Sequence, residues 1–189
     1  MQPSAAQLQD APPVTMTDLA WEDYRGVRLP RAADDGPRDT RDGLALGYSR
    51  TPRGALLAAI HISLRANARW GTEVFEPTIN DQIVGPGTDL LLSSARTAAQ
   101  ASKSAEDARG YVVIEGFRWL GYTPETASLD LVSAGPGDSD TTARAATRLQ
   151  VQWREGDWRV VAPLAGGWGG SAYPVDSLDG FTLFPARGR

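Results

Sequence analysis

One stretch near the C-terminal end of the chain alternates between two kinds of side chain. From position 143 to 153 the odd positions carry Ala, Ala, Thr, Leu, Val and Trp. The even positions from 144 to 154 carry Arg, Ala, Arg, Gln, Gln and Arg. Because successive side chains of a strand point to opposite faces, this pattern predicts an antiparallel strand with one face on a core and the other in water. Such a strand requires further strands beside it and a layer that covers its apolar face.

Neighbouring segments supply these further strands. The segment YVVIEGFRWLGY (111–122) is rich in aromatic and β-branched residues, and TASLDLVSA (126–134) alternates apolar with polar positions. The turn REGD leads into WRVVAPL, which predicts a hairpin with Trp153 and Trp158 on one covered face. We therefore expect an antiparallel sheet of about four strands.

Helices are expected before this sheet. Thr51 can cap a helix and Pro52 suits its first turn, so a helix of about 16 residues should follow. Its first half is apolar nearly all round, which is typical of a helix covered on more than one side. Shorter patterns predict a second helix over 77–83 and a third from Thr88 to about position 108.

The order of these elements predicts an α+β domain in which three N-terminal helices pack on one face of a curved antiparallel sheet of about four strands. This order resembles the cone-shaped fold of the nuclear transport factor 2-like superfamily. We expect residues 1–20 to form a flexible linker or tail, 21–184 the single domain and 185–189 a C-terminal tail.

Composition excludes several classes of function. The chain has no cysteine and one histidine, His61, which excludes disulfides, thiolate sites and multi-histidine metal sites. Its net charge is -4 and its arginines are scattered, so a direct nucleic-acid footprint is not expected. Neither a metal nor a cofactor is predicted.

Three titratable residues are candidates for chemistry inside a cone. Strand parity places Glu115 on the face of Phe117, where burial would raise the carboxyl pKa and suit a general base. The alternative is that Gly116 marks a bulge that turns Glu115 outward. Asp130 is expected to face water, and His61 to lie at the solvent edge of its helix.

Two aromatic residues lie in the glycine-rich segment near the C-terminal end. Trp168 and Tyr173 are interpreted either as lids on the core or as exposed partner contacts. The segments GYSRT and GGSAY lack the pattern of a nucleophile elbow, and GGWGG lacks the lysine of a phosphate loop. No catalytic residue is therefore predicted.

Several phrases together resemble a known family. They are GVRLPRAADDGP, GYSRTPRGALLAAIHISLRA, FEPTINDQIVGPG, GFRWLGYTPETASLDLV, VQWREGDWRVVAP and DSLDGFTLF. In this order they resemble a family of actinobacterial proteins encoded in conjugative or integrative elements. These proteins are similar to the extracellular domains of type IV secretion scaffolds.

The resemblance implies a non-enzymatic assembly subunit of a conjugative DNA-transfer apparatus, on the outer side of the cell envelope. Implied partners are other machinery proteins and further copies of the chain, with the membrane reached only through an anchor absent from this sequence. The alternative is a small-molecule-binding or enzymatic domain with Glu115 in its cavity. A secreted effector with a peptide-binding sheet edge is a third hypothesis.

Overall fold

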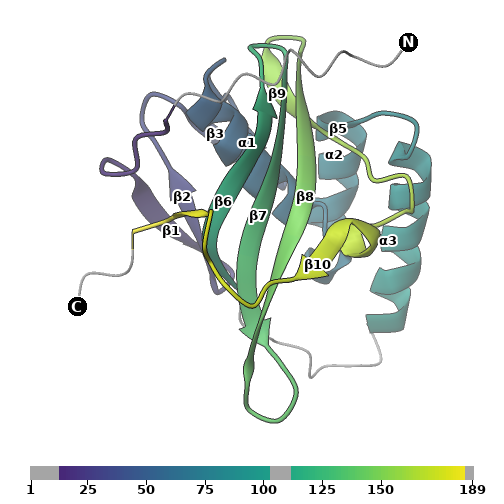
Figure 1. The fold of residues 1–189 in the computed structure, drawn as a ribbon. Helices are drawn as coiled ribbons and strands as arrows, with labels where there is room; N and C mark the ends of the chain where they lie inside the picture. The colour runs from purple at the N-terminus through teal and green to yellow at the C-terminus, as the bar shows by residue number, and fades with distance from the viewer. Residues whose placement is uncertain (1–12, 103–111, 186–189) are drawn as a thin grey trace, which may run out of the picture.

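A seven-stranded mixed sheet forms the centre of the fold (Figure 1). The computed structural model describes residues 13–102 and 112–185. The strand order is β11-β6-β7-β8-β9-β5. In addition, β10 pairs with the beginning of β8, and β9 pairs with its end. The strands are β5 (Ile83–Val84), β6 (Val113–Tyr122), β7 (Thr126–Pro136), β8 (Thr142–Arg154), β9 (Asp157–Val161), β10 (Ala172–Pro174) and β11 (Thr182–Leu183).

Three α-helices lie behind this sheet in Figure 1. They are α1 (Pro52–Arg65), α2 (Thr72–Gln82) and α3 (Thr88–Ser102), and a 3-10 helix (Ala68–Trp70) joins α1 to α2. Every residue of α1 from Gly54 to Ile62 is buried. The helix contacts β7, β8 and β9 on one side and β2, β4 and α2 on the other. Its all-round apolar sequence follows from this double cover.

Two hairpins precede the helices. One pairs β1 (Ala20–Tyr24) with β2 (Val27–Arg31), and the other pairs β3 (Asp39–Arg41) with β4 (Leu44–Leu46). Their turns are Arg25-Gly26 and Asp42-Gly43, and all four residues have positive φ. Tight hairpin turns require this conformation, which glycine adopts without strain.

The expected order of three N-terminal helices on a sheet of about four strands is therefore wrong, although the chain is α+β overall. Two hairpins stand before the helices, and the sheet gains three short strands, β5, β10 and β11. The parallel pairing of β5 with β9 makes the sheet mixed. Strands of two or three residues are too short to show alternation, so the sequence pattern did not reveal β5 and β10. The expected likeness to the nuclear transport factor 2-like superfamily was based on an order of elements that differs from the observed order.

The expected boundaries can be compared only in part with the structure. Regular structure runs from β1 to β11, but residues 1–12 and 186–189 lie outside the described ranges. Most of the expected linker and C-terminal tail therefore falls outside them as well. No helix in the described ranges has the length and apolar character that crossing a bilayer requires.

The tryptophan pair of the β8–β9 hairpin lies against the core. The Trp153 and Trp158 rings meet edge to face, with centroids 5.5 Å apart. Trp158 is fully buried, and its indole Nε1 donates to the Ser49 carbonyl at 2.8 Å. The pair therefore fastens the hairpin to the chain segment that leads into α1.

The motif SRTPRG holds the start of α1 in place. The Thr51 hydroxyl accepts the Gly54 amide hydrogen at 3.0 Å as the helix cap, and donates to buried Asp35 at 2.6 Å. Asp35 also accepts from Ser49 and Arg53. The sequence SRTPRG is thus explained by the entry of the chain into its central helix.

Gly54→Ala tests this close approach. A Cβ added at Gly54 would lie 2.0 Å from the Ser49 carbonyl oxygen. Alanine favours a helix by up to about 1 kcal/mol over glycine, but the clash should outweigh this and destabilise the fold by about 2 kcal/mol or more. Urea unfolding followed by tryptophan fluorescence measures the change.

Gly167→Ala is the matched control, because nothing lies within 4 Å of its added Cβ and its backbone is extended. We expect the control to unfold like the wild type. A Gly54→Ala protein as stable as the wild type would contradict the packing at the start of α1.

Candidate functional site

A row of charged side chains crosses the middle of the sheet on the face opposite α1, here called the front face. Arg118 of β6, Asp130 of β7 and Arg148 of β8 are direct neighbours in the strand register. Arg118 Nη2 donates to Asp130 Oδ2 at 3.0 Å, and Arg148 Nε donates to Oδ1 at 3.0 Å. The carboxylate is 0% exposed, whereas the arginine side chains are 40% and 58% exposed. The negative charge is therefore buried while both positive groups reach solvent.

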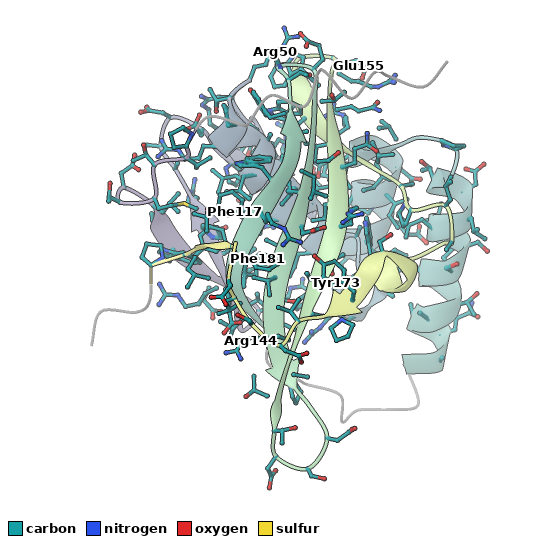
Figure 2. All side chains as sticks on the ribbon, in the orientation of Figure 1. Arg50, Phe117, Arg144, Glu155, Tyr173 and Phe181 are labelled. Carbon is teal, nitrogen blue, oxygen red and sulfur yellow. The ribbon has the colours of Figure 1, made fainter. Side chains whose placement is uncertain are left out.

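The C-terminal segment 172–184, here called the C-terminal strap, covers the lower part of the front face. It begins as β10 beside β8, crosses in front of the sheet and ends as β11 beside β6 (Figure 1). Tyr173 and Phe181 of the strap both lie over the sheet (Figure 2). The Tyr173 hydroxyl donates to Asp130 Oδ2 at 2.7 Å, and the Arg118 guanidinium lies 4.7 Å from the Phe181 ring centre. The strap therefore completes the burial of Asp130.

These contacts fix the charge state of the row. Burial by itself raises the pKa of Asp130, but hydrogen bonds from Arg148, Tyr173 and Arg118 outweigh it and leave this pKa below its ordinary value. The hydrogen bond to Asp130 raises the pKa of Arg118 and of Arg148. Burial and the bond to the carboxylate raise the pKa of the Tyr173 hydroxyl. At neutral pH the row is an ionised carboxylate between two guanidinium ions.

Glu115 lies on the front face and not in the interior. The register between β6 and β7 shifts between Ile114 and Gly116, so Glu115 is the extra residue of a bulge. Its carboxylate accepts two hydrogen bonds from Arg144, at 2.6 and 3.1 Å. This bond raises the pKa of Arg144. Both of its oxygens are thus engaged by a guanidinium.

A cavity of about 210 Å³ lies between the C-terminal end of α1 and the sheet. Leu64, Ile114, Leu131 and Leu149 line it, and Trp168 of the 3-10 helix Trp168–Ser171 closes one side. Glu115 is not among its lining residues. The volume is below the roughly 300 Å³ at the lower end of ligand sites. Among the residues that the structure describes, a larger depression of about 340 Å³ is lined only by α3, and one helix face cannot enclose a ligand.

His61 is fully buried, so the expectation that it lies at the solvent edge of α1 is wrong. Its Nε2 is 2.8 Å from the Pro30 carbonyl oxygen and its Nδ1 is 3.0 Å from Arg65 Nη1. A carbonyl can only accept and a guanidinium can only donate, so the ring hydrogen is on Nε2. Burial, and then the charge of Arg65, lower the pKa of His61 to about 3. The imidazole is neutral and sealed inside the fold.

The charged row combines residues that sequence reasoning treated separately or missed. Asp130 was placed correctly on the face opposite the apolar strand positions, but it is buried there and does not face water. Tyr173 was singled out, whereas Arg118, Arg148 and Phe181 were not. The arginine at position 148 was visible in the β8 alternation, but its partner depends on strand register, which the sequence does not reveal. Within 13–102 and 112–185 no three acidic or histidine side chains are grouped to hold a metal ion.

Comparison with known proteins gives one result. A family model described as "Domain of unknown function (DUF8175)" matches residues 2–183. Searches among curated proteins and among solved structures gave no match. The match spans both hairpins, the three helices and the whole sheet.

The buried His61 predicts a pH-dependent stability. Its pKa is about 3 in the folded protein and ordinarily 6.5. Below pH 6.5 His61 therefore binds a proton in the unfolded chain but not in the folded protein. The free energy of unfolding then falls as the pH drops towards 3. The slope should approach about 1.4 kcal/mol per pH unit. Urea unfolding between about pH 7 and pH 5.5, above the range in which most carboxyl groups take up protons, measures it.

His61→Gln provides the comparison, because this chain has no other histidine. The variant should be less stable at neutral pH and nearly independent of pH over the same range. A wild-type curve as flat as that of the variant would show that His61 is not held neutral by burial.

Asp130→Asn should destabilise the fold by about 2 kcal/mol, because a buried acceptor of charged hydrogen bonds loses its charge. Chemical unfolding at neutral pH measures the loss. Glu76→Gln is the matched control, since Glu76 also pairs with an arginine, Arg96, but at the surface of the helices. The control should unfold like the wild type, and equal effects in both variants would contradict the special position of Asp130.

Proposed function

We propose that this chain, which belongs to the family described as Domain of unknown function (DUF8175), is a non-enzymatic assembly domain that works through protein–protein contacts. The proposed setting is a conjugative DNA-transfer apparatus on the outer side of the cell envelope. That setting rests on the likeness of the sequence to proteins of conjugative and integrative elements.

One support for a non-enzymatic role is the state of the three candidate bases. Glu115 is held by two bonds from Arg144, and Asp130 by Arg118, Arg148 and Tyr173. The His61 imidazole is neutral and fully buried. A general base must reach the proton that it removes, and none of these groups is free to do so. The alternative hypothesis, an enzyme that uses Glu115 as a base inside its cavity, is therefore less well supported, because Glu115 does not line a cavity.

The observation that carries the proposal is the charged row on the front face. Protein interfaces are enriched in arginine and tyrosine, and side chains that are already ordered lose less entropy when a partner binds. Arg118 and Arg148 are ordered by Asp130, yet their side chains remain 40% and 58% exposed. Figure 1 shows the upper part of β6, β7 and β8 uncovered in front, directly above the strap. A rigid sheet with fixed, exposed arginines is suited to contact another protein.

Deletion of the gene from a strain that carries the conjugative element tests the proposal. Transfer of the element to a recipient should fall to background, because the apparatus loses a subunit. The wild-type chain, expressed from a plasmid at native level, should restore transfer. A tagged full-length protein should also co-purify with other proteins that the element encodes.

Glu115→Gln separates assembly from catalysis in the same assay. The amide cannot act as a general base, but it keeps the size of the side chain and an acceptor for Arg144. The variant should restore transfer as well as the wild type does. Normal transfer in the deletion strain, or no transfer with a well-expressed Glu115→Gln protein, would contradict the proposed function.

A further inference from the structure

We infer that Arg118 and Arg148 form the anchor of a docking surface for an acidic polypeptide segment, whose carboxylates bind the outer edges of the two guanidinium groups. This inference rests on the proposed assembly function, and it specifies the chemistry of the partner. The surface is the front face above the C-terminal strap, from the Asp130 row up to Gln152 of β8.

The first step of the argument is the convergence of the two arginines. Arg118 Nη2 is 3.0 Å and Arg148 Nη2 is 3.5 Å from the same atom, Asp130 Oδ2. The two guanidinium groups are therefore adjacent and approach the carboxylate from strands on either side of β7. One carboxylate of a partner can reach both groups from solvent, as Asp130 does from beneath.

The second step is the supply of unused donors. Arg118 donates both of its hydrogen bonds from Nη2, and Arg148 donates from Nε and Nη2. In the described part of the chain, Nε and Nη1 of Arg118 and Nη1 of Arg148 thus have no acceptor. Guanidinium hydrogen bonds to carboxylates are strong because both groups are charged. The anchor therefore keeps donors for a second carboxylate after Asp130 is satisfied.

The third step is the polarity of the neighbouring rows. Above the anchor, Ser128 of β7 is flanked by Gly121 of β6 and Gln150 of β8, and Thr126 is paired with Gln152. The segments 118–122, 126–130 and 148–152 contain no acidic residue except buried Asp130. A partner carboxylate at the anchor therefore meets no repulsion from these strands.

The fourth step is the fixed position of the anchor beside the strap. Phe181 lies against Arg118, and Tyr173 binds both Arg118 and Asp130. Below this point the strap covers the sheet, so Val132 and Ala146 are fully buried. The anchor thus lies where the covered half of the front face meets the open half. A partner segment bound on the open half would therefore end where it meets the C-terminal strap.

Binding of a fluorescein-labelled octaglutamate peptide to the full chain, measured by fluorescence anisotropy at low salt, tests the inference. Arg148→Gln should weaken binding roughly tenfold, because one charged hydrogen-bond donor group is lost. Arg96→Gln is the control: it removes the same charge from another exposed arginine–carboxylate pair, on α3. The control should bind like the wild type.

Arg148→Lys keeps the charge and protects the fold if Arg148→Gln is unstable, and it should bind less tightly than the wild type because lysine lacks the two-pronged donor. Three results would each overturn the inference. The first is an equal loss of peptide affinity in Arg148→Gln and Arg96→Gln, and the second is no peptide binding by the wild type. The third is tighter binding of an oligothymidylate of equal charge. Failure of peptide binding together with loss of transfer in the deletion strain would remove this inference and leave the assembly function standing.

Discussion

The fold depends on the burial of α1 on every side along most of its length. Every residue of α1 from Gly54 to Ile62 is buried, and such a helix needs cover on all sides. Strands β7, β8 and β9 cover one side, and β2, β4 and α2 cover the other. The two N-terminal hairpins are therefore part of the core and not additions to it. Asp35 and the motif SRTPRG also help to hold α1 in this position, because their hydrogen bonds fix its first turn.

One face of the sheet packs against α1. The front face therefore has to be covered by another part of the chain or remain exposed. The C-terminal strap covers the lower half, where Val132 and Ala146 make the front face apolar. The upper half keeps polar side chains such as Ser128, Gln150 and Gln152. No described segment crosses in front of it in Figure 1. The row of Asp130 lies at the boundary between the halves. Its carboxylate is buried by Tyr173 of the strap, while the arginine side chains on either side are 40% and 58% exposed.

Local patterns were sufficient to predict local features. The β8 alternation, the cap at Thr51 and the aromatic hairpin of Trp153 and Trp158 are all present, because each depends on residues close in the chain. Features that depend on distant pairing were missed or misplaced. Strand β10 was missed because it exists only where the tail returns to β8. For Glu115 the sequence left both faces open, including a bulge at Gly116, and the strand register shows the bulge that turns it outward. The burial of His61 could have been predicted, since the surrounding helix is apolar all round.

A charged row in the middle of a sheet is not the most stable arrangement open to these strands. Apolar residues of similar volume in place of a buried ion pair are often neutral or stabilising by about 1–4 kcal/mol. The adjacent front-face row, with Val132 and Ala146, shows that the same strands accept apolar residues under the strap. The stability of the sheet alone therefore does not account for Asp130. What the row adds is two guanidinium groups held in fixed positions at the edge of an open surface, and recognition of another protein depends on such groups.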